Sequence, residues 1–177
     1  MAHNLLLTGR PGIGKTTVVR RTLERLPSIE RVGFTTDEIR GPKGRLGFLA
    51  RRLDGQAVVL AHVSFQGPYR VGRYGVDIAA FEREILPALD PRREGPILYV
   101  VDEIGRMECF SAVFRSLAWA LLDDDRPLLG TLALHGPEWV DRVRRREDVE
   151  IVEVTLANRD RLPEMLAERL RSWLQLG

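Results

Sequence analysis

The chain has 177 residues, of which 44% are hydrophobic and 29% are charged, an ordinary composition for one folded domain. Its 27 basic residues nearly balance its 25 acidic ones, and the net charge of +2 argues against a general polyanion binder. The single cysteine, Cys109, excludes an internal disulfide and a cysteine pair for a metal.

The apolar runs are all much shorter than the ~20 residues that a membrane helix needs. The first residues also lack the charged and apolar regions of a signal peptide. A lone cysteine is typical of a reducing compartment. We therefore expect a cytoplasmic protein that binds no membrane. Because the sequence gives no sign of an obligate partner, we also expect a monomer.

Short apolar runs alternate with longer amphipathic stretches, which predicts an α/β fold with a mostly parallel sheet. The predicted strands are Asn4–Thr8, Val32–Thr36, Ile97–Val101, Leu128–Leu132 and Glu150–Val154. The predicted helices cover residues 15–26, 78–89, 111–122 and about 158–175. Asp77 precedes the second of these helices, and Ser111 begins the third. Both residues have side chains that commonly cap the N-terminus of a helix.

Residues 40–76 interrupt this alternation. Gly41–Gly44 has the composition of a turn, and Asp54-Gly55 separates two strand-like runs in the manner of a hairpin. A glycine-rich segment follows at residues 66–75. We expect an antiparallel insertion attached to the sheet of a single domain, residues 1–177. The order of the strands within the sheet stays open.

The strongest motif lies between the first predicted strand and the first predicted helix. It reads Gly9-Arg10-Pro11-Gly12-Ile13-Gly14-Lys15-Thr16 and matches G-x-x-x-x-G-K-[ST]. Glycines let the backbone N–H groups surround a phosphate, and the helix N-terminus adds partial positive charge. Lys15 would reach the β- and γ-phosphates, and the Thr16 hydroxyl would bind Mg²⁺. The segment is predicted to be a nucleotide-binding P-loop.

Two carboxylates end the predicted strand that precedes residue 102. Asp102 would hold the Mg²⁺ that bridges the phosphates. Glu103 would act as the general base that activates water for attack on the γ-phosphate. Two solvated acids at a strand end are the alternative interpretation. Beside a P-loop, the catalytic interpretation is favoured for both residues.

Further candidates are less specific. Thr131 ends another predicted strand, where its hydroxyl would sense the γ-phosphate, although a β-branched residue is equally typical of any strand. The nucleobase is expected at the loop after the last strand, Thr155–Arg159, because ligands bind beyond the carboxyl ends of such strands. An Asn-Lys-x-Asp motif for guanine is absent from the sequence.

Phosphoryl transfer also calls for an additional cation, and the chain has many arginines but only two lysines, Lys15 and Lys43. Arg70 and Arg73 in the glycine-rich segment would form a lid. Further candidates are Arg106, Arg142, Arg144, Arg145, Arg146 and Arg159. The run at 142–146 lacks interleaved aromatic residues and is followed by acids, so nucleic acid is not an expected partner.

The sequence resembles the small P-loop nucleoside-triphosphatase family that includes a thermophile nucleoside triphosphatase and the animal cancer-related nucleoside triphosphatase. The strings that carry the resemblance are Leu7–Thr17, Gly33–Glu38, Val71–Asp77, Val101–Glu108, Gly130-Thr131 and Asn158-Arg159. They are spread over nearly the whole chain, and Asp102-Glu103-Ile104-Gly105 followed by Met107-Glu108 is the most particular of them.

The resemblance implies a three-layer, RecA-like P-loop core and a slow Mg²⁺-dependent hydrolase of ATP, GTP and other nucleoside triphosphates. It also implies low base selectivity and weaker activity on nucleoside diphosphates. The nucleotide-binding residues expected on this basis are Gly9, Arg10, Pro11, Gly12, Ile13, Gly14, Lys15, Thr16, Thr17, Asp102, Glu103, Ile104, Gly105, Arg106, Asn158 and Arg159.

Two other functions remain open at this point. A P-loop kinase for a nucleoside or small molecule would use the 66–75 segment as a lid that excludes water. A nucleotide switch or a nucleic-acid-linked ATPase would use the basic run at 142–146. Glu103 favours hydrolysis over kinase transfer, because hydrolysis requires an activated water and transfer must exclude it. Turnover that rises sharply with DNA or RNA would favour the nucleic-acid-linked ATPase.

Overall fold

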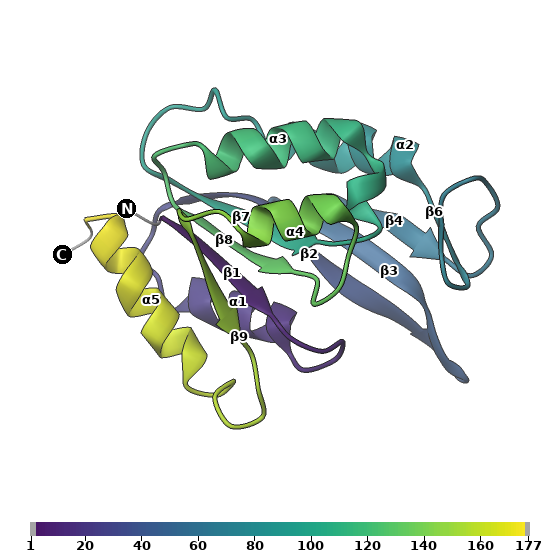
Figure 1. Ribbon diagram of the computed structural model, residues 1–177, viewed down its shortest axis with the longest axis horizontal. Helices are drawn as coiled ribbons and strands as arrows, with labels where there is room; N and C mark the ends of the chain where they lie inside the picture. Colours follow the sequence, from purple (N-terminus) through teal and green to yellow (C-terminus); the bar gives the residue numbers. More distant parts are fainter. Residues whose placement is uncertain (1–2, 176–177) are drawn as a thin grey trace.

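The computed structural model describes residues 3–175 and contains one nine-stranded mixed sheet between helices (Figure 1). The sheet has the order β5-β6-β4-β3-β2-β7-β8-β1-β9. Its parallel part consists of β1 (Asn4–Thr8), β2 (Glu30–Gly41), β7 (Ile97–Ile104), β8 (Leu128–Leu132) and β9 (Val149–Glu153). Its antiparallel part consists of β3 (Gly44–Arg52), β4 (Ala57–His62), β5 (Arg70–Val71) and β6 (Tyr74–Val76).

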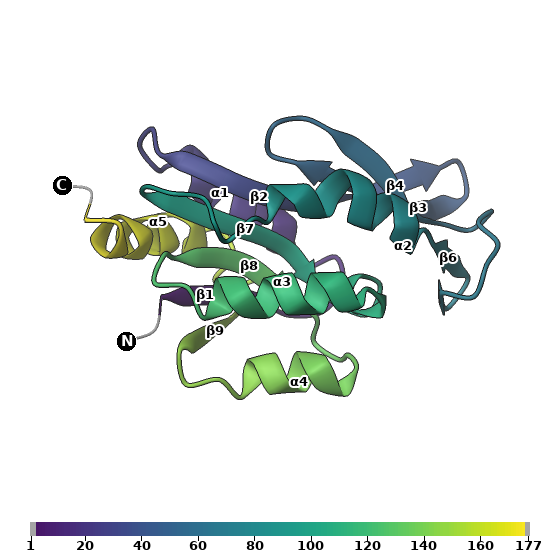
Figure 2. The ribbon, with the colours of Figure 1, turned by 90° about the horizontal axis from the view of Figure 1, so that it is seen from above.

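Helices cover both faces of the parallel part, which makes three layers (Figures 1 and 2). One face carries α1 (Lys15–Glu24) and α5 (Leu162–Trp173), and the other carries α2 (Ile78–Ala80), α3 (Ala112–Leu122) and α4 (Glu138–Arg144). Successive side chains of a strand point to opposite faces. Leu5 and Leu7 therefore join the core under α1 and α5, whereas Leu6 joins the core under α3.

The strand order distinguishes between two possible P-loop sheets. β8 lies between β1, which precedes the P-loop, and β7, which ends in Asp102 and Glu103. This is the RecA-like order rather than the kinase-like order, which the sequence alone left open. The predicted α/β class with a mostly parallel sheet and an antiparallel insertion is confirmed.

Several element boundaries differ from the sequence-based expectation. β2 continues to Gly41 instead of ending at Thr36, because it pairs with β3 as a long hairpin closed by the Gly41–Gly44 turn. The helix expected at 78–89 is α2 followed by a π-helical turn and a 3₁₀ turn, the last of which contains Pro87. The helix α4 was not predicted, and α5 begins at Leu162 rather than near residue 158.

The two N-caps are confirmed. The Asp77 side chain accepts a hydrogen bond from the backbone N–H of Ala80, and the Ser111 hydroxyl accepts one from that of Phe114.

Within residues 3–175, no helix is both long and apolar enough to cross a membrane. The single domain stays a prediction, and its outermost residues, 1–2 and 176–177, lie outside the described part of the chain.

Candidate functional site

The P-loop connects β1 to α1 at the carboxyl end of the parallel strands. Gly9 has φ 146°, and a side chain there would place its Cβ 2.9 Å from the carbonyl oxygen of Val154. Gly14 precedes α1 in a left-handed conformation with φ 109°. Both positions therefore need glycine. The Lys15 ammonium lies across the loop and donates a hydrogen bond of 2.8 Å to the carbonyl oxygen of Gly9.

Asp102 is held at the end of β7 by three neighbouring elements. Its Oδ2 accepts a hydrogen bond of 2.7 Å from the Thr16 hydroxyl, and its Oδ1 accepts one of 2.7 Å from the Thr131 hydroxyl. The backbone N–H of Thr36 on β2 lies 3.4 Å from Oδ2. Burial raises the pKa of Asp102, and the hydroxyl groups of Thr131 and Thr16 oppose that effect. The side chain is thereby fixed against α1, β2 and β8.

Thr16 and Asp102 fit a site for Mg²⁺. The Thr16 hydroxyl oxygen and Asp102 Oδ2 are hard oxygen donors 2.7 Å apart, so both side chains reach the same point. Among the described residues, no cluster of three histidine, cysteine, aspartate or glutamate side chains forms a complete metal cage. Mg²⁺ commonly keeps waters and phosphate oxygens as its other ligands. The pair therefore suits a metal ion that is shared with a bound nucleotide.

Glu103 follows Asp102 and lines the same cleft, where its carboxylate has no hydrogen-bond partner within residues 3–175. Burial and the charge of Asp102 raise the pKa of Glu103 to about 7, whereas Lys15 lowers it. A carboxylate with a pKa near neutral pH is well suited to accept a proton from water. Glu103 therefore lies where the predicted general base is required, and that role stays a prediction.

Glu108 is a third acid of this region that sequence reasoning did not single out for a role. It is 4% exposed, and burial together with the charge of Glu103 raises its pKa well above the ordinary value. Gly105 lies between the two glutamates: an added Cβ would collide with the Glu103 carboxylate and would come within 3.2 Å of Glu108 Oε2. The absence of a side chain at position 105 is what lets both carboxyl groups pack there.

A cleft of about 740 Å³ contains the site. The sequence-predicted residues that line it are Gly9, Pro11, Gly12, Gly14, Lys15, Thr16, Thr17, Asp102, Glu103 and Arg106. Ile13, Ile104 and Thr131 are buried beneath its surface, and Arg10 is exposed outside it. Arg106 is exposed and, within residues 3–175, forms no ion pair.

Asn158 and Arg159 lie behind the P-loop rather than in the lining of the cleft. Arg159 donates a hydrogen bond of 3.2 Å to the carbonyl oxygen of Ile13. The side-chain oxygen of Asn158 accepts from the backbone N–H of Thr155, and its NH₂ group donates to the carbonyl oxygen of Glu153. Asn158 therefore shapes its own loop, and Arg159 braces the P-loop.

Arg70 and Arg73 are part of the insertion, make their hydrogen bonds within it and do not line the cleft. Arg70 donates to the carbonyl oxygens of Phe65 and Arg73, each at 3.0 Å. Arg73 donates to the carbonyl oxygen of Arg45 and to the Tyr74 hydroxyl, the latter at 3.3 Å. Their role as a lid and the role of Thr131 as a γ-phosphate sensor stay predictions.

The basic run at 142–146 is engaged with its own surroundings. Arg144 pairs with Asp141 at 2.7 Å, and Arg146 pairs with Asp123 and Asp148. The guanidinium of Arg142 lies over the ring of Trp119, 5.2 Å from its centre. These contacts account for three of the four arginines without a polyanion.

The residues that sequence reasoning missed in the cleft come mainly from the second half of β2 and from the insertion. They include Arg20, Asp37, Glu38, Arg40, Arg45, Phe48, Tyr74 and His135. Arg20 on α1 pairs with Asp37 on β2 at 2.6 Å. Residues 37–40 read Asp-Glu-Ile-Arg and show no apolar–polar alternation, so the sequence offered little signal that the strand continues past Thr36.

Comparisons with known proteins find a family and relatives that match nearly the whole chain. A model of a family described as NTPase matches residues 4–167. The nucleoside-triphosphatase THEP1 of Natranaerobius thermophilus is 41% identical over 176 residues, which cover 97% of this chain and 98% of that protein. The human cancer-related nucleoside-triphosphatase is 36% identical over 177 residues, which cover 92% and 93% of the two chains.

Two solved structures are similar over almost the whole chain. The crystal structure of THEP1 from Aquifex aeolicus has a TM-score of 0.83 at 31% identity and covers 94% of this chain and 98% of that one. The solution structure of the human cancer-related nucleoside triphosphatase has a TM-score of 0.78 at 34% identity and covers 97% and 98%. The similarity therefore includes both the parallel core and the insertion.

Proposed function

We propose that this chain hydrolyses ATP, GTP and other nucleoside triphosphates with low base selectivity. The chain belongs to the NTPase family and is a nucleoside-triphosphatase. The observation that carries the proposal is the meeting of Lys15, the Thr16–Asp102 pair and Glu103 in one cleft. These groups come from β1–α1 and β7, which are separated in the sheet by β8. Together they supply phosphate binding, a metal site and a base.

Each residue has one task in the proposed reaction. The P-loop N–H groups and the Lys15 ammonium bind the β- and γ-phosphates. Mg²⁺ held by Thr16 and Asp102 would neutralise charge on these phosphates. Glu103 accepts a proton from the water that attacks the γ-phosphorus opposite the bridging oxygen. The bond from the γ-phosphorus to that oxygen breaks, and the products are a nucleoside diphosphate and phosphate.

Arg106 is the arginine that we assign to the charge that develops on the γ-phosphate. It lines the cleft three residues after Glu103, and it forms no ion pair among residues 3–175 that would hold it elsewhere. By contrast, Arg20 is paired with Asp37 and Arg159 is bound to the P-loop backbone. An unpaired guanidinium is available to a phosphate at no cost of breaking another contact.

Low base selectivity is supported by the loop after β9. Each polar group of the Asn158 side chain makes a hydrogen bond within the loop, which turns the amide toward the loop backbone, and Asn158 does not line the cleft. The sequence has no Asn-Lys-x-Asp motif for guanine. A diphosphate would offer fewer oxygens to Lys15 and to the metal, so we propose that diphosphates are hydrolysed more weakly.

The test is a phosphate-release assay with ATP, GTP, CTP, UTP and the four diphosphates, with and without Mg²⁺. We expect release from all triphosphates, with Mg²⁺ and without any added acceptor. A small-molecule kinase, the second candidate, would release no phosphate until an acceptor is supplied. The same preparation, run on a sizing column with light scattering, tests whether the domain of residues 1–177 acts as a monomer.

The role of Glu103 is tested by Glu103→Gln, which keeps the size of the side chain and removes its basicity. We expect nucleotide binding to persist and kcat to fall about 10²–10⁴-fold, the usual contribution of a general base. Glu147→Gln, at an exposed position, is the matched control. A Glu103→Gln enzyme that hydrolyses at the wild-type rate would overturn the mechanism.

A further inference from the structure

The cleft extends beyond the residues that the proposed hydrolysis uses. Its second part is lined by Arg45 and Phe48 of β3, Leu60 of β4, Val71 of β5 and Tyr74 of β6. All of these strands lie on the far side of β2 from the P-loop strand β1 (Figure 1). The insertion therefore builds one wall of the cleft, and that wall is mostly apolar and aromatic.

This second compartment lies directly beside the metal-binding carboxylate. The backbone N–H of Thr36 is 3.4 Å from Asp102 Oδ2, and Glu38 is two residues further along the same strand. At the rise of an extended strand, Glu38 lies about 7 Å beyond that contact. Glu38 pairs across the ladder with Phe48, so their side chains share one face. A molecule in this compartment would be next to the terminal phosphate of a bound triphosphate.

The polar groups of the compartment carry an excess of positive charge. The Glu38 carboxylate is paired with two arginines, Arg45 at 2.9 Å and Arg40 at 2.5 Å. Arg45 also donates to the Tyr74 hydroxyl at 3.0 Å, and its guanidinium lies 4.9 Å from the centre of the Phe48 ring. Two guanidinium groups therefore share one carboxylate next to two aromatic rings, and Glu38 neutralises only one of their two positive charges, which leaves the other for an added anion. Guanidinium groups favour phosphate, and aromatic side chains favour a flat ring.

Hydrolysis alone does not require such a wall. The reaction needs one water molecule in front of Glu103, and a water molecule gains nothing from Phe48, Leu60 or Val71. We propose that the compartment formed by Arg40, Arg45, Phe48 and Tyr74 is a second ligand subsite, which binds an aromatic monophosphate of the nucleoside 5′-monophosphate class beside the triphosphate. The inference rests on the proposed function only for the position of the triphosphate.

Binding is measured by titration calorimetry with the P-loop already filled by Mg²⁺ and a non-hydrolysable ATP analogue. The probes are AMP and CMP, with adenosine and inorganic phosphate as the two halves of the ligand. We expect one molecule of monophosphate to bind per chain with a Kd of about 10⁻⁵–10⁻³ M. Adenosine and phosphate should each bind at least about tenfold more weakly, because each lacks one of the two interactions.

Two variants locate the binding. Arg45→Ala removes a guanidinium, and Phe48→Leu removes the ring while it keeps an apolar side chain; each should weaken AMP binding at least about tenfold. Arg83→Ala, at an exposed arginine outside the cleft, is the control and should leave the Kd unchanged. Circular dichroism confirms that each variant is folded, and Phe48→Leu keeps the test valid if Arg45→Ala does not fold.

The subsite is overturned if neither monophosphate binds to the analogue-filled protein, if they displace the analogue, or if both variants bind AMP as the wild type does. Because the analogue is not hydrolysed, this result does not depend on catalysis. A wild-type protein that releases no phosphate from any triphosphate would overturn the proposed function and leave the binding experiment interpretable.

Discussion

At the scale of single residues, Asp102 shows how a buried carboxylate is prepared for a metal. It is 2% exposed and accepts hydrogen bonds from two threonine hydroxyls, of which only Thr16 lines the cleft. Thr131 is fully buried and holds the other carboxylate oxygen. A hydrogen bond to the charged form favours that form. Thr131 therefore positions Asp102 and opposes the rise in its pKa that burial causes.

Thr131→Val tests this positioning role with a side chain of nearly the same shape. Loss of the hydroxyl leaves Asp102 Oδ1 without that partner, at a cost of about 1–3 kcal/mol, and favours the protonated carboxyl. We expect the Mg²⁺ concentration for half-maximal phosphate release to rise. Thr22→Val is the matched control, because its buried hydroxyl donates only to Val18 of its own helix. An unchanged Mg²⁺ dependence in Thr131→Val would contradict the role.

Glu108 makes a prediction about stability and pH. Its pKa in the folded protein is raised by burial and by the charge of Glu103, so folding favours the protonated form. The folded state then binds more protons than the unfolded state, and the free energy of unfolding falls as pH rises above the ordinary glutamate value. Glu108→Gln cannot ionise, so we expect it to raise Tm at pH 8 more than at pH 5. Equal shifts at both pH values would show that ionisation of Glu108 has no part in stability.

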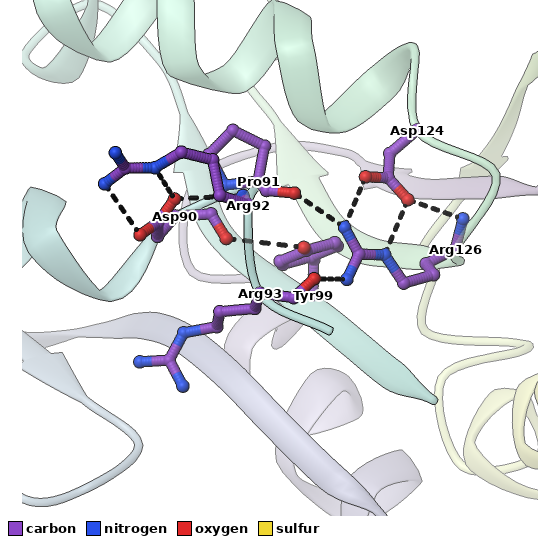
Figure 3. A network of polar contacts seen from close by, with 7 residues as sticks. All are labelled: Asp90, Pro91, Arg92, Arg93, Tyr99, Asp124 and Arg126. Atoms are coloured by element: carbon purple, nitrogen blue, oxygen red, sulfur yellow. Dashed lines mark hydrogen bonds and ion pairs between the residues drawn. The ribbon is translucent and has the colours of Figure 1, made fainter. Parts of the chain in front are cut away.

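At the scale of elements, a polar network joins the loops that precede β7 and β8, at the opposite end of these strands from the cleft. Arg126, in the loop that precedes β8, binds Asp124 of the same loop at 2.6 Å and the carbonyl oxygen of Pro91, in the loop that precedes β7, at 2.8 Å (Figure 3). It also donates to the carbonyl oxygen of Arg93, and its guanidinium lies over the ring of Tyr99. The arginine thus holds together the starts of two central strands.

Arg126→Ala removes all of these contacts at once. Since the Arg126 side chain is only 20% exposed, we expect the free energy of unfolding to fall by about 1.5–3 kcal/mol, the range for hydrogen bonds to charged groups. Arg92→Ala, in the loop that precedes β7, is the control, because among residues 3–175 Arg92 pairs with the nearby Asp90 alone and its side chain is 88% exposed. Urea unfolding measures both variants. Equal stability of the two would contradict the role of Arg126 as a connection between loops.

At the scale of the whole molecule, the cleft is assembled from residues within 9–20, 36–74, 102–108 and 133–135, which span much of the sequence. A ligand that binds there contacts the folded state and has no comparable site in the unfolded chain. Binding at 100 times Kd therefore stabilises the fold by about 2.7 kcal/mol, which raises Tm by roughly 5–10 °C for a chain of this size.

The measurement is thermal unfolding with Mg²⁺ alone, with a non-hydrolysable ATP analogue alone, and with both. We expect the largest rise in Tm with both, because Thr16 and Asp102 hold the metal only together with phosphate oxygens. Lys15→Ala should lose most of the rise, since the phosphates lose their cationic partner. A wild-type Tm that does not respond to the combination would contradict the nucleotide site.

The sequence was informative wherever the chemistry is local. The P-loop is one contiguous strand–loop–helix, so the glycine positions and Lys15 followed from a single short motif. The Asp102–Glu103 pair likewise followed from a buried strand that ends in acids. The boundary of β2 was less predictable, because residues 37–41 become a strand only through pairing with β3. Helix α4 is only seven residues long and has little periodicity to detect.

By itself, the sequence determined the α/β class, the P-loop and the two acids of the site, because these depend on local backbone preference and on the alternation of apolar residues. Only the tertiary structure decided the strand order, with β8 between β1 and β7, and the contact of Thr131 with Asp102. It also decided that Glu38, Arg45 and Tyr74 share one wall of the cleft. Side-chain packing and strand register bring these residues together. No short segment of the chain specifies either of them.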